Sequence, residues 1–132
     1  MKSQIVSLHT ELDNYKPGLG TIMMDLQAHH SKLWFAGSNS NWKLADFQLE
    51  EIEEAIEDVE KFHSTRPEAK SISMLDNAMS QVESAIDGRN RIAFETSFNI
   101  LTQTCNSCHQ VNNVGFNEIR VPEKNPFANQ KF

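Results

Sequence analysis

The chain has 132 residues, of which 39% are hydrophobic and 23% charged, and its formal net charge at pH 7 is −6. This length and composition are typical of one globular domain that spans residues 1–132. The negative charge argues against nucleic acid and anionic membrane surfaces as partners. No stretch approaches the roughly 18 apolar residues of a membrane-spanning helix, so no membrane insertion is expected.

Two segments with helical periodicity occupy the first half of the chain. The first expected helix runs from about residue 18 to 36, and Gly37 marks its end. The second runs from about residue 42 to 63, and Pro67 follows it near the start of the next helix. Apolar residues of the second helix, spaced alternately by four and three, are Ala45, Leu49, Ile52, Ile56 and Val59.

Two further helices are expected over residues 68–87 and 90–111, with Gly88 between them. Four amphipathic helices joined by short loops predict an all-α fold, an antiparallel up-down-up-down four-helix bundle over residues 18–111. The apolar stripe of the last helix continues into both cysteines of the chain, which places them in the core. Members of this stripe are Phe94, Phe98, Leu101, Cys105 and Cys108.

Residues 112–132 differ from the helical part. Asn113, Gly115, Pro122 and Pro126 disfavour a long helix here, although several apolar residues are available for packing. We expect an irregular, non-helical tail that folds back over the end of the bundle carrying the cysteines. A disordered tail is the alternative.

The run Cys105-Asn106-Ser107-Cys108-His109 contains the only two cysteines of the chain. C-x-x-C-H is the attachment motif of a c-type haem. Each thiol can form a thioether with a vinyl group of the porphyrin, and the imidazole can bind the iron as proximal ligand. Residues three and four apart share one face of a helix, so all three side chains can reach one macrocycle.

Other sites are weaker alternatives. A redox dithiol would accompany a βαβ pattern, and structural zinc would need a second pair of ligands. Glu60-x-x-His63 matches one element of a carboxylate-bridged di-iron bundle, but the chain has no second copy of it. The acidic residues of the second helix are typical of a solvated face, or alternatively of a docking surface for a basic redox partner. Nothing indicates a catalytic triad or a phosphate loop, so no enzyme is expected.

With these features the chain resembles the class II cytochromes c, that is, cytochrome c′ and its low-spin relatives. These are four-helix bundles with C-x-x-C-H near the end of the last helix. The resemblance implies a periplasmic protein with one covalent haem c, anchored by Cys105 and Cys108, with His109 as proximal ligand. It also implies that a homodimer can form through the first two helices. The tail of 23 residues after His109 is longer than is usual in that family.

The sixth iron ligand decides between two functions. On an ideal helical wheel Met23 lies near the middle of the apolar stripe and Met24 on the polar side, so Met23 is the candidate ligand. Iron coordinated by Met23 predicts a carrier of single electrons between redox protein partners. If Met23 only fills the core, Leu19 and Ile22 line a pocket for nitric oxide or carbon monoxide. His30 is expected to be hydrogen-bonded at the far end of the bundle.

A third alternative is a helical interaction protein without haem. Haem is attached to C-x-x-C-H outside the cytoplasm, so attachment requires export. Residues 1–7 lack the apolar stretch of a signal peptide, and this favours the alternative without haem. We expect that a leader was removed and that Met1 was added for expression. A natural start at Met1 would instead weigh against haem.

Overall fold

The computed structural model describes residues 16–132, and the N-terminal segment considered for a leader lies outside this range. Within it, all regular structure is helical and no strand occurs. Helices α2 (Leu19–Ser38), α3 (Trp42–Phe62) and α6 (Arg91–Val111) are continuous, and a third, interrupted segment lies between α3 and α6. The predicted all-α arrangement of four helices is confirmed. None of the described helices is both long and apolar enough to cross a lipid bilayer.

The prediction of one continuous helix over residues 68–87 is wrong. The segment consists of α4 (Pro67–Ser71), the short 3-10 helix η1 (Ile72–Met74) and α5 (Leu75–Asp87). Ile72 and Leu75 are both buried, with 2% exposure each. Because a 3-10 helix has three residues per turn, two residues three apart face the core as well in this geometry as in an α-helix. The apolar spacing therefore did not reveal the change.

Local signals in the sequence set the ends of the helices. Asn41 and Asn90 cap α3 and α6, since each side-chain oxygen accepts a hydrogen bond from the backbone N–H three residues later, at 3.3 and 3.0 Å. Ser40 and Arg89 follow α2 and α5 in the left-handed region, with φ of 58° and 49°. These short reversals place the next helix beside the preceding one.

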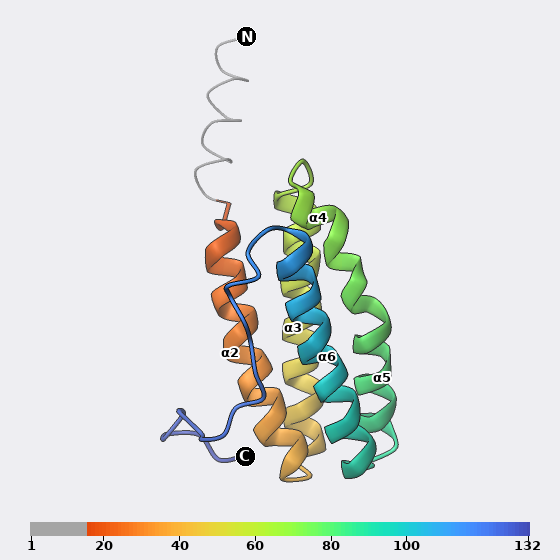
Figure 1. Cartoon of the computed structure of the whole chain (residues 1–132). Helices are drawn as coiled ribbons and strands as arrows, with labels where there is room; N and C mark the ends of the chain where they lie inside the picture. The colour runs from red at the N-terminus through yellow and green to blue at the C-terminus, as the bar shows by residue number, and fades with distance from the viewer. Residues whose placement is uncertain (1–15) are drawn as a thin grey trace, which may run out of the picture.

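The helices form two close pairs. Helix α2 packs along α3, and α5 packs along α6, whereas α2 meets α6 and α3 meets α5 over fewer residues. Figure 1 shows the α2–α3 and α5–α6 connections at one end of the body, and α4 with the C-terminal end of α6 at the other. Large side chains that are almost completely buried fill the interior: Leu33, Leu49, Ile52, Val59, Val82, Phe94, Phe98 and Leu101.

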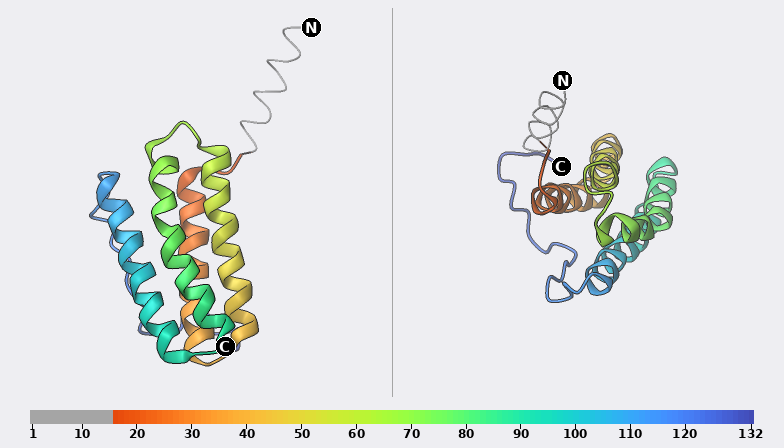
Figure 2. Two further views of the ribbon diagram at one scale, coloured as in Figure 1. Left: turned by 90° about the vertical axis from the view of Figure 1, so that its right-hand side faces the viewer. Right: turned by 90° about the horizontal axis from the view of Figure 1, so that it is seen from above.

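The tail, residues 112–132, contains no helix. It leaves the C-terminal end of α6 and runs back beside α2 toward the opposite end of the body (Figures 1 and 2). Val121 and Phe132 pack against the core, and the ring of Phe132 lies 5.6 Å from that of Phe35. The tail therefore starts at the end that carries the cysteines, as expected, but it continues beside the C-terminal half of α2.

Candidate functional site

The two cysteines lie on the buried face of α6. Each is 8% exposed, and both are free thiols. Cys105 follows Phe98 and Leu101 on this face, at the spacing that keeps residues on one side of a helix. The expected continuation of the apolar stripe into the cysteines agrees with this burial.

The surroundings of the two thiols differ. Cys105 belongs to the apolar core, and burial, reinforced by the neighbouring Cys108, raises its pKa to about 12. The Cys105 thiol is therefore protonated and a poor nucleophile at neutral pH. The Cys108 Sγ instead lies 3.7 Å from Ser71 Oγ and 3.5 Å from Asn112 Nδ2, in polar surroundings.

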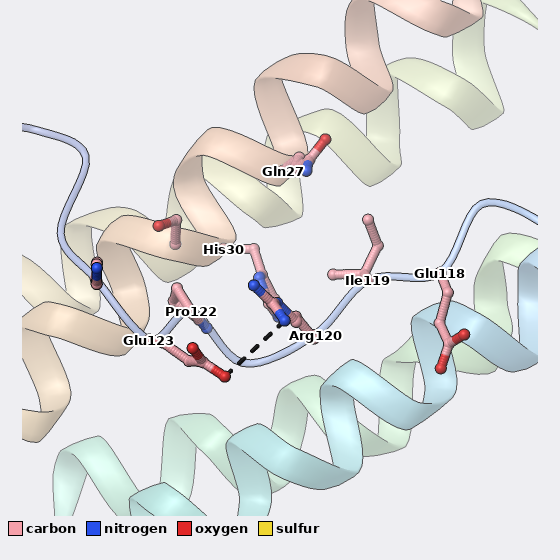
Figure 3. Close-up of a pocket in the computed structure, with 9 residues that line it drawn as sticks. Gln27, His30, Glu118, Ile119, Arg120, Pro122 and Glu123 are labelled. Carbon is pink, nitrogen blue, oxygen red and sulfur yellow. Dashed lines mark ion pairs between the residues drawn. The ribbon is translucent and has the colours of Figure 1, made fainter.

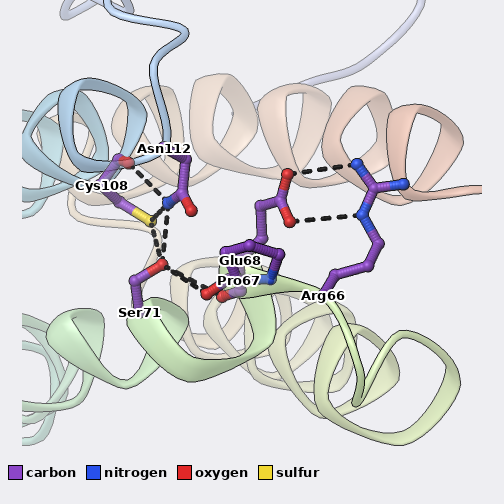
Figure 4. A network of polar contacts seen from close by, with 6 residues as sticks. All are labelled: Arg66, Pro67, Glu68, Ser71, Cys108 and Asn112. Carbon is purple, nitrogen blue, oxygen red and sulfur yellow. Dashed lines mark hydrogen bonds and ion pairs between the residues drawn. The ribbon is translucent and has the colours of Figure 1, made fainter.

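A small hydrogen-bond network joins α4 to the end of α6 (Figure 4). Asn112 Nδ2 donates to Ser71 Oγ and to the Cys108 carbonyl, both at 2.8 Å. The Ser71 hydroxyl reaches the carbonyls of Pro67 and Glu68 at 3.2 and 3.3 Å. The network fixes the position of Cys108 relative to α4.

His109 is held through one nitrogen of its ring. The half-buried imidazole places Nδ1 2.6 Å from the backbone carbonyl oxygen of Asn117. Since a carbonyl only accepts, Nδ1 donates its proton to it, and in the neutral form of the ring Nε2 then has a free lone pair. Within residues 16–132 no hydrogen bond is assigned to Nε2. This arrangement is typical of histidines that bind a metal through one nitrogen and donate the other N–H to a carbonyl.

The chain reverses directly after α6 to bring this carbonyl to His109. Val114 N–H donates to the His109 carbonyl at 2.8 Å, and Asn113 N–H donates to Gln110 at 3.1 Å. Asn113 has φ of 64°, so the end of α6 is a Schellman motif with asparagine in the left-handed position. A turn closed by Asn117 N–H and the Val114 carbonyl, at 2.9 Å, follows.

A second pair of contacts ties the tail to the motif itself. The Asn106 side chain donates from Nδ2 to the Ile119 carbonyl at 2.8 Å and accepts from the Ile119 N–H at 2.7 Å. Neither Asn106 nor Asn117 was among the expected site residues, because variable positions of C-x-x-C-H carry no signal. The clustered asparagines after residue 111 indicated only the end of the helix.

Met23 lies on the inner side of α2, where it is half-buried and packs against the core, whereas Met24 is 72% exposed. This difference is the one the helical wheel predicted. Coordination of iron by Met23 stays a prediction.

His30 is buried in the middle of the body. Its Nε2 lies 2.8 Å from Thr102 Oγ1, and its ring lies 4.5 Å from that of Phe98. Burial lowers the pKa of His30 to about 4, so the ring is neutral at physiological pH. The expected hydrogen bond is present, but the expected position at the far end of the bundle is wrong, because the partner Thr102 stands one helical turn before Cys105.

A cavity of about 550 Å³ separates α2 from the tail beside His30 (Figure 3). The wall of this cavity includes neither cysteine of the motif, nor His109. Its lining residues are Gln27, His30, Ser31, Glu118, Ile119, Arg120, Pro122, Glu123 and Lys124.

The described part of the chain gives no support for a metal site made of protein ligands alone. Over residues 16–132 no three side chains of His, Cys, Asp or Glu gather as such a site. His63, the histidine of the di-iron alternative, places Nε2 2.8 Å from the carbonyl of Pro17. One of its ring nitrogens is thus occupied by the backbone.

The three side chains of the motif have the donor chemistry that covalent attachment of a haem requires. Two thiols without a disulfide partner face the core three residues apart, and the adjacent imidazole has Nε2 available as a ligand. Helices α2 and α6 contact each other over fewer residues than α2 and α3 do, or α5 and α6. Comparison with known proteins adds nothing to this geometry: no family model, no curated protein and no solved structure matches the chain.

Proposed function

We propose that this chain is a c-type cytochrome that holds one covalent haem and carries single electrons between protein partners. The proposal rests on one observation above all. Cys105, Cys108 and His109 stand together at the end of α6, with both thiols buried and the imidazole oriented by a hydrogen bond to Asn117.

In this proposal each residue of the motif has a separate task. Cys105 and Cys108 anchor the porphyrin, and His109 Nε2 binds the iron. When bound, the haem supplies a reversible one-electron couple. Phe98 and Leu101 exclude water from the buried face of α6, and such burial is one of the factors that set a haem potential.

The wider context belongs to the same proposal. An up-down-up-down course of the four helices, a place among the class II cytochromes c and a periplasmic location are consistent with the helix order and with the motif. A homodimer formed through α2 and α3 is also part of this proposal. A basic redox partner would meet the exposed acidic residues of α3, such as Glu50, Glu54 and Glu57.

One observation favours a second function. Ile22 is only 4% exposed and so lies deeper in the core than the half-buried Met23. An apolar residue facing the iron would leave the sixth position open to nitric oxide or carbon monoxide. In that case the protein is a gas-binding module and not an electron carrier.

Maturation of the chain in the bacterial periplasm, behind a cleavable leader and with haem-attachment enzymes present, tests the first proposal. We expect one haem that stays on the chain through denaturation, detected by intact mass and by absorption. Cys105→Ala with Cys108→Ala should abolish attachment, whereas Ser107→Ala between them should not. Wild-type chain without covalent haem, beside a control cytochrome matured in the same cells, would refute the proposal.

The same material separates the two functions. If Met23 binds the iron, Met23→Leu removes the sulfur-to-iron absorption band of the oxidised protein, and Met24→Leu preserves it. Immediate binding of carbon monoxide by the reduced wild type, with a high-spin spectrum, would favour the gas-binding module.

A further inference from the structure

We propose that the C-terminal tail is the positioning element for the proximal histidine: Asn106 clamps the tail at Ile119, and the clamped tail presents the Asn117 carbonyl to His109. This inference rests on the proposed function, because it assigns tail residues to the environment of the haem iron. It concerns a part of the chain that the resemblance to class II cytochromes does not cover.

The clamp is directional. An amide that donates to and accepts from the same residue satisfies both backbone groups of Ile119, at 2.8 and 2.7 Å. Such a pair resembles one rung of an antiparallel ladder, so it fixes both the position and the orientation of the tail. Asn106 is itself rigid, since it stands in α6 between the two cysteines.

The clamp and the helix end hold the intervening segment from both sides. On one side the Schellman motif fixes Val114 against His109 at 2.8 Å, and on the other Asn106 fixes Ile119. Asn117 lies between these two points, only two residues before Ile119. Its carbonyl therefore approaches His109 Nδ1 at 2.6 Å without any contact from the Asn117 side chain being required.

The consequence for the iron follows from the chemistry of imidazole. An acceptor at Nδ1–H makes the ring a stronger electron donor through Nε2 and fixes its orientation. A stronger donor favours the oxidised iron, so the hydrogen bond lowers the reduction potential. Loss of the clamp should raise the potential, because the carbonyl is then free to move away from the ring.

The experiment compares Asn106→Ala with two matched controls on the matured protein. Ser107→Ala alters the adjacent position of the motif, where the hydroxyl donates only to the Gln103 carbonyl of its own helix. Asn117→Ala removes the side chain but leaves the backbone acceptor. We expect both controls to retain the wild-type reduction potential.

In Asn106→Ala we expect a higher potential and faster solvent exchange of the His109 Nδ1 proton, by up to about tenfold for one lost hydrogen bond. Asn106→Asp keeps the acceptor for the Ile119 N–H, so its ring-proton exchange should fall between wild type and Asn106→Ala, whereas its added negative charge lowers the potential by itself. An Asn106→Ala protein that matches Ser107→Ala in potential and in ring-proton exchange would overturn the inference.

Failure of the clamp can be distinguished from failure of the proposed function. Nitrogen NMR reads the tautomer and the exchange of the His109 ring in the chain with or without haem. If the chain attaches no haem, the cytochrome proposal fails, while an unprotected Nδ1 proton in the wild type would refute the clamp independently.

Discussion

At one end of the four-helix body aromatic rings pack against one another, and at the other a set of hydrogen bonds surrounds the C-x-x-C-H motif. Near the α2–α3 and α5–α6 connections, the ring of Phe94 lies 6.3 Å from Trp34, 6.0 Å from Trp42 and 5.8 Å from Phe98. Gly37 makes room for this cluster, because a Cβ at that position would collide with the Phe94 ring. We call these four aromatic residues the aromatic end.

The opposite end carries the motif and is assembled differently. Cys108, Asn112 and Ser71 share one network, and the tail contributes backbone groups to Asn106 and His109. Several of these atoms belong to residues that are half-buried or exposed. We call this region the motif end.

The two ends differ in what they contribute: the aromatic end stabilises the fold, and the motif end orients the side chains of the site. Apolar burial is non-directional and proportional to the area removed from water, so the large buried rings of the aromatic end contribute strongly to the free energy of folding. Hydrogen bonds add little net free energy, but their geometry is narrow. They are therefore suited to fix a ring or a thiol at one angle. Substitutions that shorten side chains at the aromatic end should destabilise the whole fold. Substitutions at the motif end should alter the site within an intact fold.

Phe94→Ala gives the largest expected effect. The side chain is fully buried, so its removal leaves a cavity and should lower the free energy of unfolding by about 3–5 kcal/mol. Urea denaturation followed by circular dichroism measures the loss. Ile92→Ala, at a position of the same helix that is 78% exposed, should change stability by no more than about 0.5 kcal/mol. Equal effects of the two substitutions would contradict the assignment of stability to the aromatic end.

The pH dependence of stability gives the next largest effect. Burial lowers the pKa of His30 from 6.5 to about 4, so below pH 6.5 the unfolded chain binds a proton that the folded chain does not. Stability contributed by neutral His30 is complete above pH 6.5 and falls as the pH drops toward 4. The loss over this window is about 3 kcal/mol.

Denaturation curves between pH 7 and pH 4.5 measure this dependence. His30→Gln, which keeps an amide for Thr102 but does not titrate, should flatten the curve. His29→Gln is the matched control, because the neighbouring ring is half-buried and bonds to Gln48 instead. A wild-type slope that persists in His30→Gln would show that other groups cause it.

The aromatic end was largely accessible from the sequence. Apolar spacing of three and four identified the buried faces, and Gly37, Pro67 and Gly88 marked ends of helices within two residues. These signals are local, because a helix repeats its own geometry along the chain. The 3-10 interruption at Ile72 was missed because two helical geometries satisfy the same spacing, and it lies next to α4, toward the motif end.

The motif end was accessible only in part. C-x-x-C-H names three residues that are adjacent in the chain, and their shared helix face follows from spacing. The contacts of Asn106 with Ile119 and of His109 with Asn117 join an irregular tail to a helix. No periodic pattern in the sequence therefore predicts them. His30 likewise finds its partner Thr102 across 72 residues. Such pairings depend on the packed fold and not on local propensity.

Asn112→Ala should lower stability less than Phe94→Ala or protonation of His30, and it tests the motif end by itself. The amide loses its bonds to Ser71 Oγ and to the Cys108 carbonyl, which together should cost about 1 kcal/mol because water replaces them at this half-buried position. Ser71→Ala removes the same contact from the α4 side. If the two residues act through their shared hydrogen bond, the double variant should lose less stability than the sum of the single losses. Additive losses, measured by the same urea curves, would mean that the Ser71–Asn112 hydrogen bond does not help to hold α4 against α6. The distinction between the two ends would then disappear.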